Sequence, residues 1–101
     1  MASSKTVSFS PKQLENVAGI FKMLGEPMRL RILQALCQAP RSVNEIVEAT
    51  GSSQANVSKH LALLTGAGIL RREKEAQRVF YRIEKKLVLK LCELVKSSGL
   101  D

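Results

Sequence analysis

The 101-residue sequence predicts a mainly α-helical domain with one small β-hairpin. Apolar residues form 45% of the chain, yet only three phenylalanines and one tyrosine are present, a composition typical of helices packed through aliphatic side chains. Apolar residues recur at helical spacing over most of the sequence, and serines, glycines and prolines separate these segments. Two short runs of strand-forming residues between positions 69 and 83 interrupt the helical pattern. The length fits one domain.

A capping box predicts where the first helix begins. Residues 1–9 are polar and lack periodicity, so we expect a flexible N-terminal arm. Ser10 and Gln13 have the spacing of a capping box, and Pro11 suits the first helical position. Gly25 is expected to end this helix. Its apolar face consists of Leu14, Val17, Ala18, Phe21 and Leu24.

Two prolines delimit the second predicted helix. Pro27 opens it, it covers residues 27–39, and Pro40 ends it. The side chains expected on its buried face are Leu30, Ile32, Leu33 and Leu36.

Residues 42–65 predict two short helices joined at a glycine. Ser42 and Glu45 form a second capping box, and Gly51 supplies a left-handed stop. Ser53 then caps a helix with an aliphatic inner face, consisting of Val57, Leu61 and Leu64. Its opposite face is polar and consists of Gln54, Asn56, Ser58, Lys59 and His60. Such a helix can lie in the major groove of DNA, so the segment is interpreted as a helix-turn-helix.

A basic hairpin follows the helix-turn-helix. Gly66 and Gly68 end the helix, and residues 69–74 and 78–83 form the two predicted strands. The connection lacks the Asn-Gly signature of a tight turn, so we expect a slightly longer loop. Five cations belong to the hairpin: Arg71, Arg72, Lys74, Arg78 and Arg82. The order of elements predicts a winged helix-turn-helix with four helices, two strands and a fifth helix. The alternative is an exposed hairpin that its charges keep soluble.

The wide apolar stripe of the last helix predicts a homodimer. The stripe is wide for a terminal helix and consists of Leu87, Val88, Leu91, Leu94 and Val95. A domain of this size cannot easily cover both this stripe and that of the first helix, so we expect a homodimer through the first and last helices. Packing of these two helices within one chain is the alternative. The domain then covers residues 10–97, and 98–101 form a tail.

Charge and composition indicate the partner and the compartment. The net charge is +7 and the pI is about 9.9, so the surface should attract polyanions. No apolar run is long enough for a membrane span, and no signal peptide is apparent. Two cysteines give no disulfide framework, which favours a reducing cytoplasm. We expect double-stranded DNA and a second copy of the chain as partners, with no membrane.

Two stretches resemble the ArsR/SmtB family of winged-helix transcriptional repressors. Residues 24–30, LGEPMRL, resemble the family signature that enters the second helix, and residues 53–61, SQANVSKHL, resemble its recognition helix. The similarity covers about residues 14–95. The resemblance implies a dimer that binds a palindromic operator and is released by an inducer, whose identity the residues do not indicate. It also implies that Gln54, Ser58 and Lys59 face the groove, with Ser53 and His60 near phosphate.

The chemistry of single residues refines the expected DNA contacts. The Gln54 amide can bond adenine, Ala55 can touch a thymine methyl, and Ser58 can reach a base or a phosphate. The residues expected on the DNA backbone are Lys59, Arg71, Arg72 and Arg78. For His60, a surface or hinge imidazole bonded to phosphate or backbone is the alternative. The predicted DNA-binding residues are Ser53, Gln54, Ala55, Asn56, Ser58, Lys59, His60, Arg71, Arg72, Gln77 and Arg78.

Metal-sensing sites and catalytic sites are not expected. The helix beginning near Ser42 has no Cys-x-Cys, the last helix has no histidine, and one histidine with two separated cysteines cannot make a recognised zinc site. The sequence has no nucleophile elbow, no glycine-rich phosphate loop and no cluster of histidine with carboxylates. We therefore predict no cofactor and no enzymatic activity.

Cys37 and Cys92 leave two interpretations open. Both can act as small buried hydrophobic residues. Some members of the resembled family sense oxidants or reactive sulfur through a cysteine on the second helix and another on the last, although these positions match imperfectly. The chain can therefore be a thiol-responsive repressor, or a constitutive regulator without an inducer.

Overall fold

The protein's structure, a computed structural model, describes residues 8–99. Within these residues the elements are α1 (Pro11–Leu24), α2 (Pro27–Leu36), β1 (Arg41–Ser42), α3 (Val43–Thr50), α4 (Gln54–Gly66), β2 (Leu70–Glu75), β3 (Arg78–Ile83) and α5 (Lys86–Ser97). The predicted order of helices and hairpin is confirmed. Of the arm predicted at 1–9 and the tail at 98–101, residues 1–7, 100 and 101 lie outside the described residues.

Local hydrogen bonds fix the starts of α1 and α3, as the capping boxes predict. The Gln13 amide donates to Ser10 Oγ at 3.2 Å, and the Ser10 amide donates to Gln13 Oε1 at 2.9 Å. At α3, the Glu45 amide donates to Ser42 Oγ at 3.3 Å, and the Ser42 amide donates to Glu45 Oε1 at 2.8 Å. These bonds satisfy amides that have no partner inside the helix. Gly51 ends α3 at φ 72° and thereby sets the turn into α4.

The sheet is antiparallel, with the strand order β1-β3-β2. Glu75 pairs with Arg78, so Ala76 and Gln77 alone form the hairpin loop, and the expectation of a longer loop is wrong. Ala76 has φ 56°, a left-handed conformation that favours glycine or asparagine, which is why the residue types at this turn do not signal its tightness. Strand β1 was not predicted, because its two residues gain their pairing from Phe80 and Tyr81 of β3.

One aliphatic core lies where α2, α3, α4 and the sheet meet. Its buried side chains are Ile32, Leu33, Leu36, Ile46, Val57, Leu61, Leu64, Ile69, Leu70 and Val88. Three of the four α2 residues expected inside are buried, but Leu30 is 46% exposed, so that expectation is wrong. Leu30 instead borders an open cavity that α5 also lines. Helix α2 ends at Leu36, earlier than predicted.

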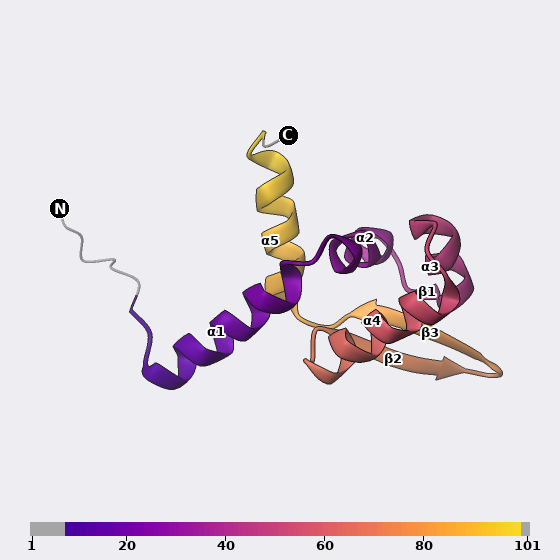
Figure 1. Cartoon of the computed structure of the whole chain (residues 1–101), viewed down its shortest axis with the longest axis horizontal. Helices are drawn as coiled ribbons and strands as arrows, with labels where there is room; N and C mark the ends of the chain where they lie inside the picture. Colours follow the sequence, from indigo (N-terminus) through magenta and orange to yellow (C-terminus); the bar gives the residue numbers. More distant parts are fainter. Residues whose placement is uncertain (1–7, 100–101) are drawn as a thin grey trace.

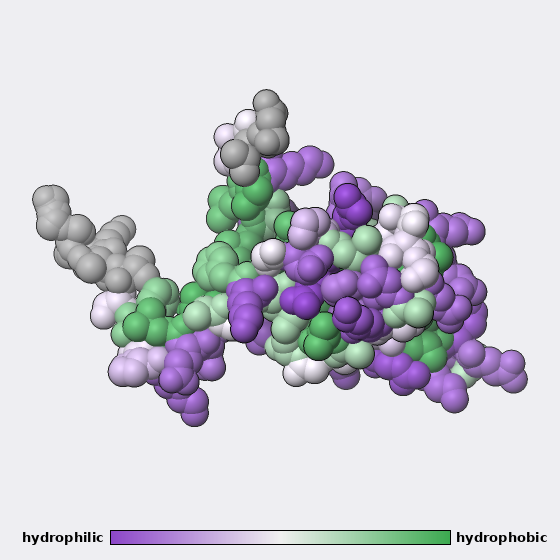
Figure 2. All heavy atoms as spheres, viewed as in Figure 1, coloured by the Kyte–Doolittle hydropathy of each residue, from purple (hydrophilic) through white to green (hydrophobic). Residues whose placement is uncertain are grey.

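Helices α1 and α5 project from this core (Figure 1). Helix α1 has no buried residue, and Val88 is the one buried residue of α5. Apolar side chains accordingly gather on both helices, whereas polar side chains cover much of the surface over α3, α4 and the hairpin in the same view (Figure 2). None of the helices in the described residues combines the length and apolar character needed to cross a lipid bilayer.

Candidate nucleic-acid interface

Helix α4 presents a short polar surface at its N-terminal end. Ser53 Oγ accepts from the Asn56 amide at 3.1 Å and caps the helix. The inner face is anchored by three fully buried residues, Val57, Leu61 and Leu64. Anchoring of that face leaves the opposite side in solvent. The exposed predicted contact residues of this helix and its cap are Ser53, Gln54, Ala55, Ser58 and Lys59.

A hydrogen bond from the Asn56 side chain stabilises the turn before α4. Its Nδ2 donates to Ser52 Oγ at 2.8 Å, and the residue is half-buried. A side chain held in this way has one donor engaged by the protein itself, so it is less available to a base than Gln54. Sequence reasoning missed the role of Ser52, although its spacing of four residues from Asn56 is a usable signal.

His60 does not lie on the polar face of α4, so its expected position on that face is wrong. The side chain is buried, with 6% exposed, and its Nδ1 accepts from Arg29 Nε at 3.2 Å. Position 60 is turned toward α2, because a helix of 3.6 residues per turn places it beside Val57, Leu61 and Leu64. Arg29 was not predicted as a partner, since 31 residues separate it from His60 and no local pattern links them.

Carboxylates neutralise part of the charge of the hairpin. Arg71 lies 3.7 Å from Glu73 and 3.7 Å from Glu84, and Arg82 lies 3.4 Å from Glu73. Arg72 and Lys74 are exposed, and neither has a carboxylate within 4.0 Å in the described part of the chain. These two cations therefore keep their full charge for an external anion.

The tip of the hairpin is exposed and cationic. Gln77 forms half of the two-residue loop, and Arg78 follows directly. The Arg78 guanidinium lies 4.9 Å from the centroid of the Phe80 ring, a cation–π contact that orders the side chain without neutralising it. The predicted tip residues are thus available to a ligand.

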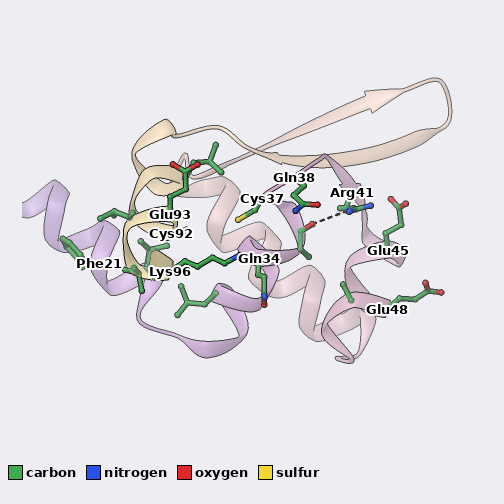
Figure 3. A pocket seen from close by; sticks show the side chains of 17 residues that line it. Phe21, Gln34, Cys37, Gln38, Arg41, Glu45, Glu48, Cys92, Glu93 and Lys96 are labelled. Atoms are coloured by element: carbon green, nitrogen blue, oxygen red, sulfur yellow. Dashed lines mark hydrogen bonds between the residues drawn. The ribbon is translucent and has the colours of Figure 1, made fainter. Parts of the chain in front are cut away.

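An open cavity of about 1300 Å³ lies between α2, α3 and α5 (Figure 3). Cys37, directly after α2, and Cys92, in α5, both line it. Burial raises the pKa of the Cys92 thiol, and the neighbouring Cys37 thiol raises it further. Cys37 is exposed and Cys92 half-buried, so the expectation that both are buried is wrong for Cys37. The structure thus brings the two predicted thiols to one cavity, away from the polar face of α4.

Side chains that could bind a metal do not cluster in residues 8–99. No group of three or more histidine, cysteine, aspartate or glutamate side chains in this range could hold a metal ion. Glu84 and Glu93, the carboxylates nearest to or within the last helix, therefore do not belong to any such group within residues 8–99.

Comparison with known proteins relates this geometry to one family. The model of the "Bacterial regulatory protein, arsR family" matches residues 26–72, which include α2, α3, α4 and the start of β2. The transcriptional regulator YgaV of Escherichia coli is 32% identical over 84 residues, which cover 82% of this chain and 85% of YgaV. The chain belongs to the ArsR family.

A solved structure supports the same assignment for this ArsR-family chain. The homodimeric winged helix-turn-helix DNA-binding domain of Mb0332 from Mycobacterium bovis, described as a possible ArsR-family regulator, superposes with a TM-score of 0.81. It is 31% identical, and the match covers 96% of this chain and 90% of that domain. The shared architecture is the winged helix-turn-helix.

One curated relative is longer than this chain. The regulator KmtR of Mycobacterium tuberculosis is 36% identical over 75 residues, which cover 74% of this chain and 58% of KmtR. The chain thus matches little more than half the length of that curated relative.

Proposed function

We propose that this ArsR-family chain is a sequence-specific DNA-binding repressor that binds a palindromic operator as a homodimer. The observation that supports the proposal best is the exposed polar face of α4, held outward by a fully buried aliphatic stripe and followed by a cationic hairpin. A helix with these two faces can enter the major groove while its inner side stays in the core.

The proposed base contacts come from the first turns of α4. Gln54 can form a bidentate pair with adenine, and Ala55 is small enough to touch a thymine methyl. Ser58 lies one turn later on the same side, within reach of a base or a phosphate. Lys59 and Ser53 are assigned to the DNA backbone. Asn56 and His60 are left out of the set, since Ser52 and Arg29 engage their side chains.

The hairpin is proposed to position the protein on the backbone of the duplex. Gln77 and Arg78 form its tip and are exposed, so they can reach the DNA beside the groove that α4 occupies. Arginine contacts to phosphate add affinity without sequence information. The net charge of +7 per chain supports a strong dependence of binding on salt.

A second copy of the chain is proposed to cover the apolar faces of α1 and α5. Large apolar side chains on these helices are more than half exposed, namely Leu14 at 53%, Phe21 at 57%, Leu87 at 51%, Leu94 at 65% and Val95 at 53%. A patch of this extent marks an interface rather than a stable free surface. The Mycobacterium bovis domain is homodimeric, which supports the same assembly here. Two recognition helices would then meet the two halves of a palindrome.

The proposed setting is the cytoplasm, where DNA is accessible, and the proposed role is regulatory rather than enzymatic. The purified 101-residue protein should bind random-sequence duplex at low ionic strength and should protect defined sites in genomic footprinting. The genes next to those sites would indicate the inducer. Failure to bind any duplex at low ionic strength would show that the proposal is wrong.

A second candidate function is a thiol-responsive repressor. The supporting observation is that Cys37 and Cys92 line one cavity and that the Cys37 thiol raises the pKa of Cys92. Oxidation by a peroxide would break two S–H bonds, form one S–S bond and pass two electrons and two protons to the peroxide. Hydrogen peroxide would leave as two water molecules, and an alkyl hydroperoxide as one water and one alcohol. The new bond would tie the end of α2 to α5, the proposed dimer helix.

Serine variants test the thiol hypothesis. Operator affinity is measured for the parent, Cys37→Ser and Cys92→Ser proteins before and after peroxide treatment. The thiol hypothesis requires a loss of affinity on oxidation in the parent alone. Equal affinities in all three proteins under both conditions would rule out the thiol hypothesis.

A further inference from the structure

We propose that the stem of the hairpin is two-sided and that only one side, the one bearing Arg72 and Lys74, binds DNA phosphates. The stem is defined here as residues 70–74 of β2 and 79–83 of β3, without the tip. This inference rests on the proposed function, because it concerns how the hairpin meets the duplex that α4 reads.

The strand register divides the stem into two faces. Side chains alternate between faces along a strand, and residues paired across antiparallel strands share a face. Leu70 pairs with Ile83, and Leu70 is buried in the core on the side where α4 contacts β2. The α4 face of the stem therefore consists of Leu70, Arg72, Lys74, Val79, Tyr81 and Ile83. The outer face consists of Arg71, Glu73, Phe80 and Arg82.

The cations of the outer face are bound to carboxylates. Glu73 lies between Arg71 and Arg82, at 3.7 Å and 3.4 Å, and Glu84 lies 3.7 Å from Arg71. A phosphate approaching this face would meet two carboxylates as well as two guanidinium groups. The outer face is thus nearly balanced in charge, and its ion pairs connect the two strands.

The α4 face has two cations and no carboxylate. Arg72 and Lys74 are both exposed, and no carboxylate of residues 8–99 lies within 4.0 Å of either. They lie two residues apart in one strand, which corresponds to about 7 Å. This step is close to the spacing of successive phosphates along one DNA strand. Arg72 and Lys74 can therefore each bind one of two consecutive phosphates.

The position of β2 places this pair next to the proposed groove-binding helix. β2 is one of the two edge strands of the sheet and contacts α4. In Figure 1, α4 and the hairpin run side by side, and the tip of the hairpin extends past the end where α4 begins. DNA bound to the first turns of α4 would consequently face the side of β2 that bears Arg72 and Lys74.

Salt dependence of binding tests the division. Affinity of the 101-residue protein for a duplex of arbitrary sequence is measured over a range of salt concentrations for the parent, Arg72→Ala, Lys74→Ala and Arg71→Ala. Log affinity falls as log salt rises. Removal of one phosphate-binding cation should make this fall shallower by about 0.9 in slope, and by twice that in a dimer. We expect this decrease in the Arg72 and Lys74 variants. Arg71→Ala removes the same charge from the neighbouring position and should leave the slope unchanged.

The outcomes separate this inference from the proposed function. An Arg71 variant whose slope falls as much as that of the Arg72 variant would overturn the two-sided stem, as would a parental slope in both the Arg72 and the Lys74 variants. In either case the parent protein still binds DNA, so the proposed function stands. A parent protein that binds no duplex would overturn both. Melting curves of all four proteins show whether each variant is folded.

Discussion

Nδ1 of His60 accepts a hydrogen bond from Nε of Arg29 at 3.2 Å. The same guanidinium donates through Nη1 to the carbonyl oxygen of Met23 at 3.2 Å, so one side chain of α2 joins the end of α1 to α4. Because a guanidinium can only donate, Nδ1 of His60 bears no proton, and the imidazole proton is on Nε2. A polar contact inside the protein thus adds to the buried aliphatic stripe that holds the proposed recognition helix.

Removing the guanidinium should destabilise the fold. Arg29→Met keeps a long apolar stem but leaves His60 Nδ1 and the Met23 carbonyl without their donor, which should cost about 1–3 kcal/mol. Urea unfolding followed by circular dichroism measures the change in the free energy of unfolding. Arg31→Met in the same helix is the control, because Arg31 is exposed and should change stability by less than about 0.5 kcal/mol. Equal midpoints for both variants would show that the contact with His60 does not stabilise the protein.

Glu45 should make stability depend on acid. The hydrogen bond from the Ser42 backbone amide is the main reason that the pKa of Glu45 lies below its ordinary value of 4.5, and the Ser42 hydroxyl lowers it further. A carboxylate whose pKa is lower in the folded state stabilises the protein above its unfolded pKa, and this contribution is lost as the pH falls through the folded value. Glu45→Gln should therefore be less stable than the parent at neutral pH. The difference should shrink in acid, as measured by thermal unfolding at several pH values, and a constant difference would contradict the assignment.

Cys92 should react more slowly than Cys37. Burial raises the pKa of Cys92 above its ordinary value of 9.0, with a further contribution from Cys37, and only the thiolate attacks an alkylating agent. At mildly alkaline pH, mass spectrometry after iodoacetamide treatment should find Cys37 modified first, because Cys37 is also exposed. In Cys37→Ser, alkylation of Cys92 should become faster, since one cause of the raised pKa is removed. Faster modification of Cys92 in the parent would contradict this account.

Local signals explain which elements could be predicted from the sequence. The capping boxes of α1 and α3 and the turn at Gly51 need only residues within one helical turn, so their positions follow from spacing alone. The aliphatic stripe of α4 follows from helical periodicity in the same way. These features together define the helix-turn-helix and its outward polar face.

Long-range contacts explain what the sequence could not provide. Strand β1 exists because Arg41 pairs with Tyr81, forty residues later in the chain, and no local pattern marks it. The sequence around His60 suggests a surface residue, because Arg29, its hydrogen-bond partner, lies far from it in the chain. Leucine is a residue type expected in a core. Leu30 nevertheless borders an open cavity, because α1 and α5 project from the core and do not cover it.

A charge on the apolar face of α1 should separate the proposed dimer. Phe21 is 57% exposed in the single chain, so Phe21→Asp should leave the fold intact and place a carboxylate in the proposed interface. Light scattering coupled to gel filtration should then find half the parental mass. Lys22→Asp is the control, because Lys22 is exposed in α1 but does not belong to its apolar face. This variant should keep the parental mass. A dimeric Phe21→Asp protein would place the interface elsewhere.

Specific and nonspecific contacts should respond differently to mutation. Gln54→Ala removes an amide that can pair with adenine, so it should cost about 1–3 kcal/mol on the footprinted operator and relax the preference at one base step. Binding to random duplex should change little.

Arg78→Ala at the tip of the hairpin should instead weaken binding to all duplexes similarly and make the salt dependence shallower by about one unit of slope for each phosphate that Arg78 neutralises. Competition titrations with operator variants and random duplex separate the two effects. If Arg78→Ala altered operator preference while nonspecific affinity stayed intact, the hairpin tip would read bases and its assignment to the DNA backbone would be wrong.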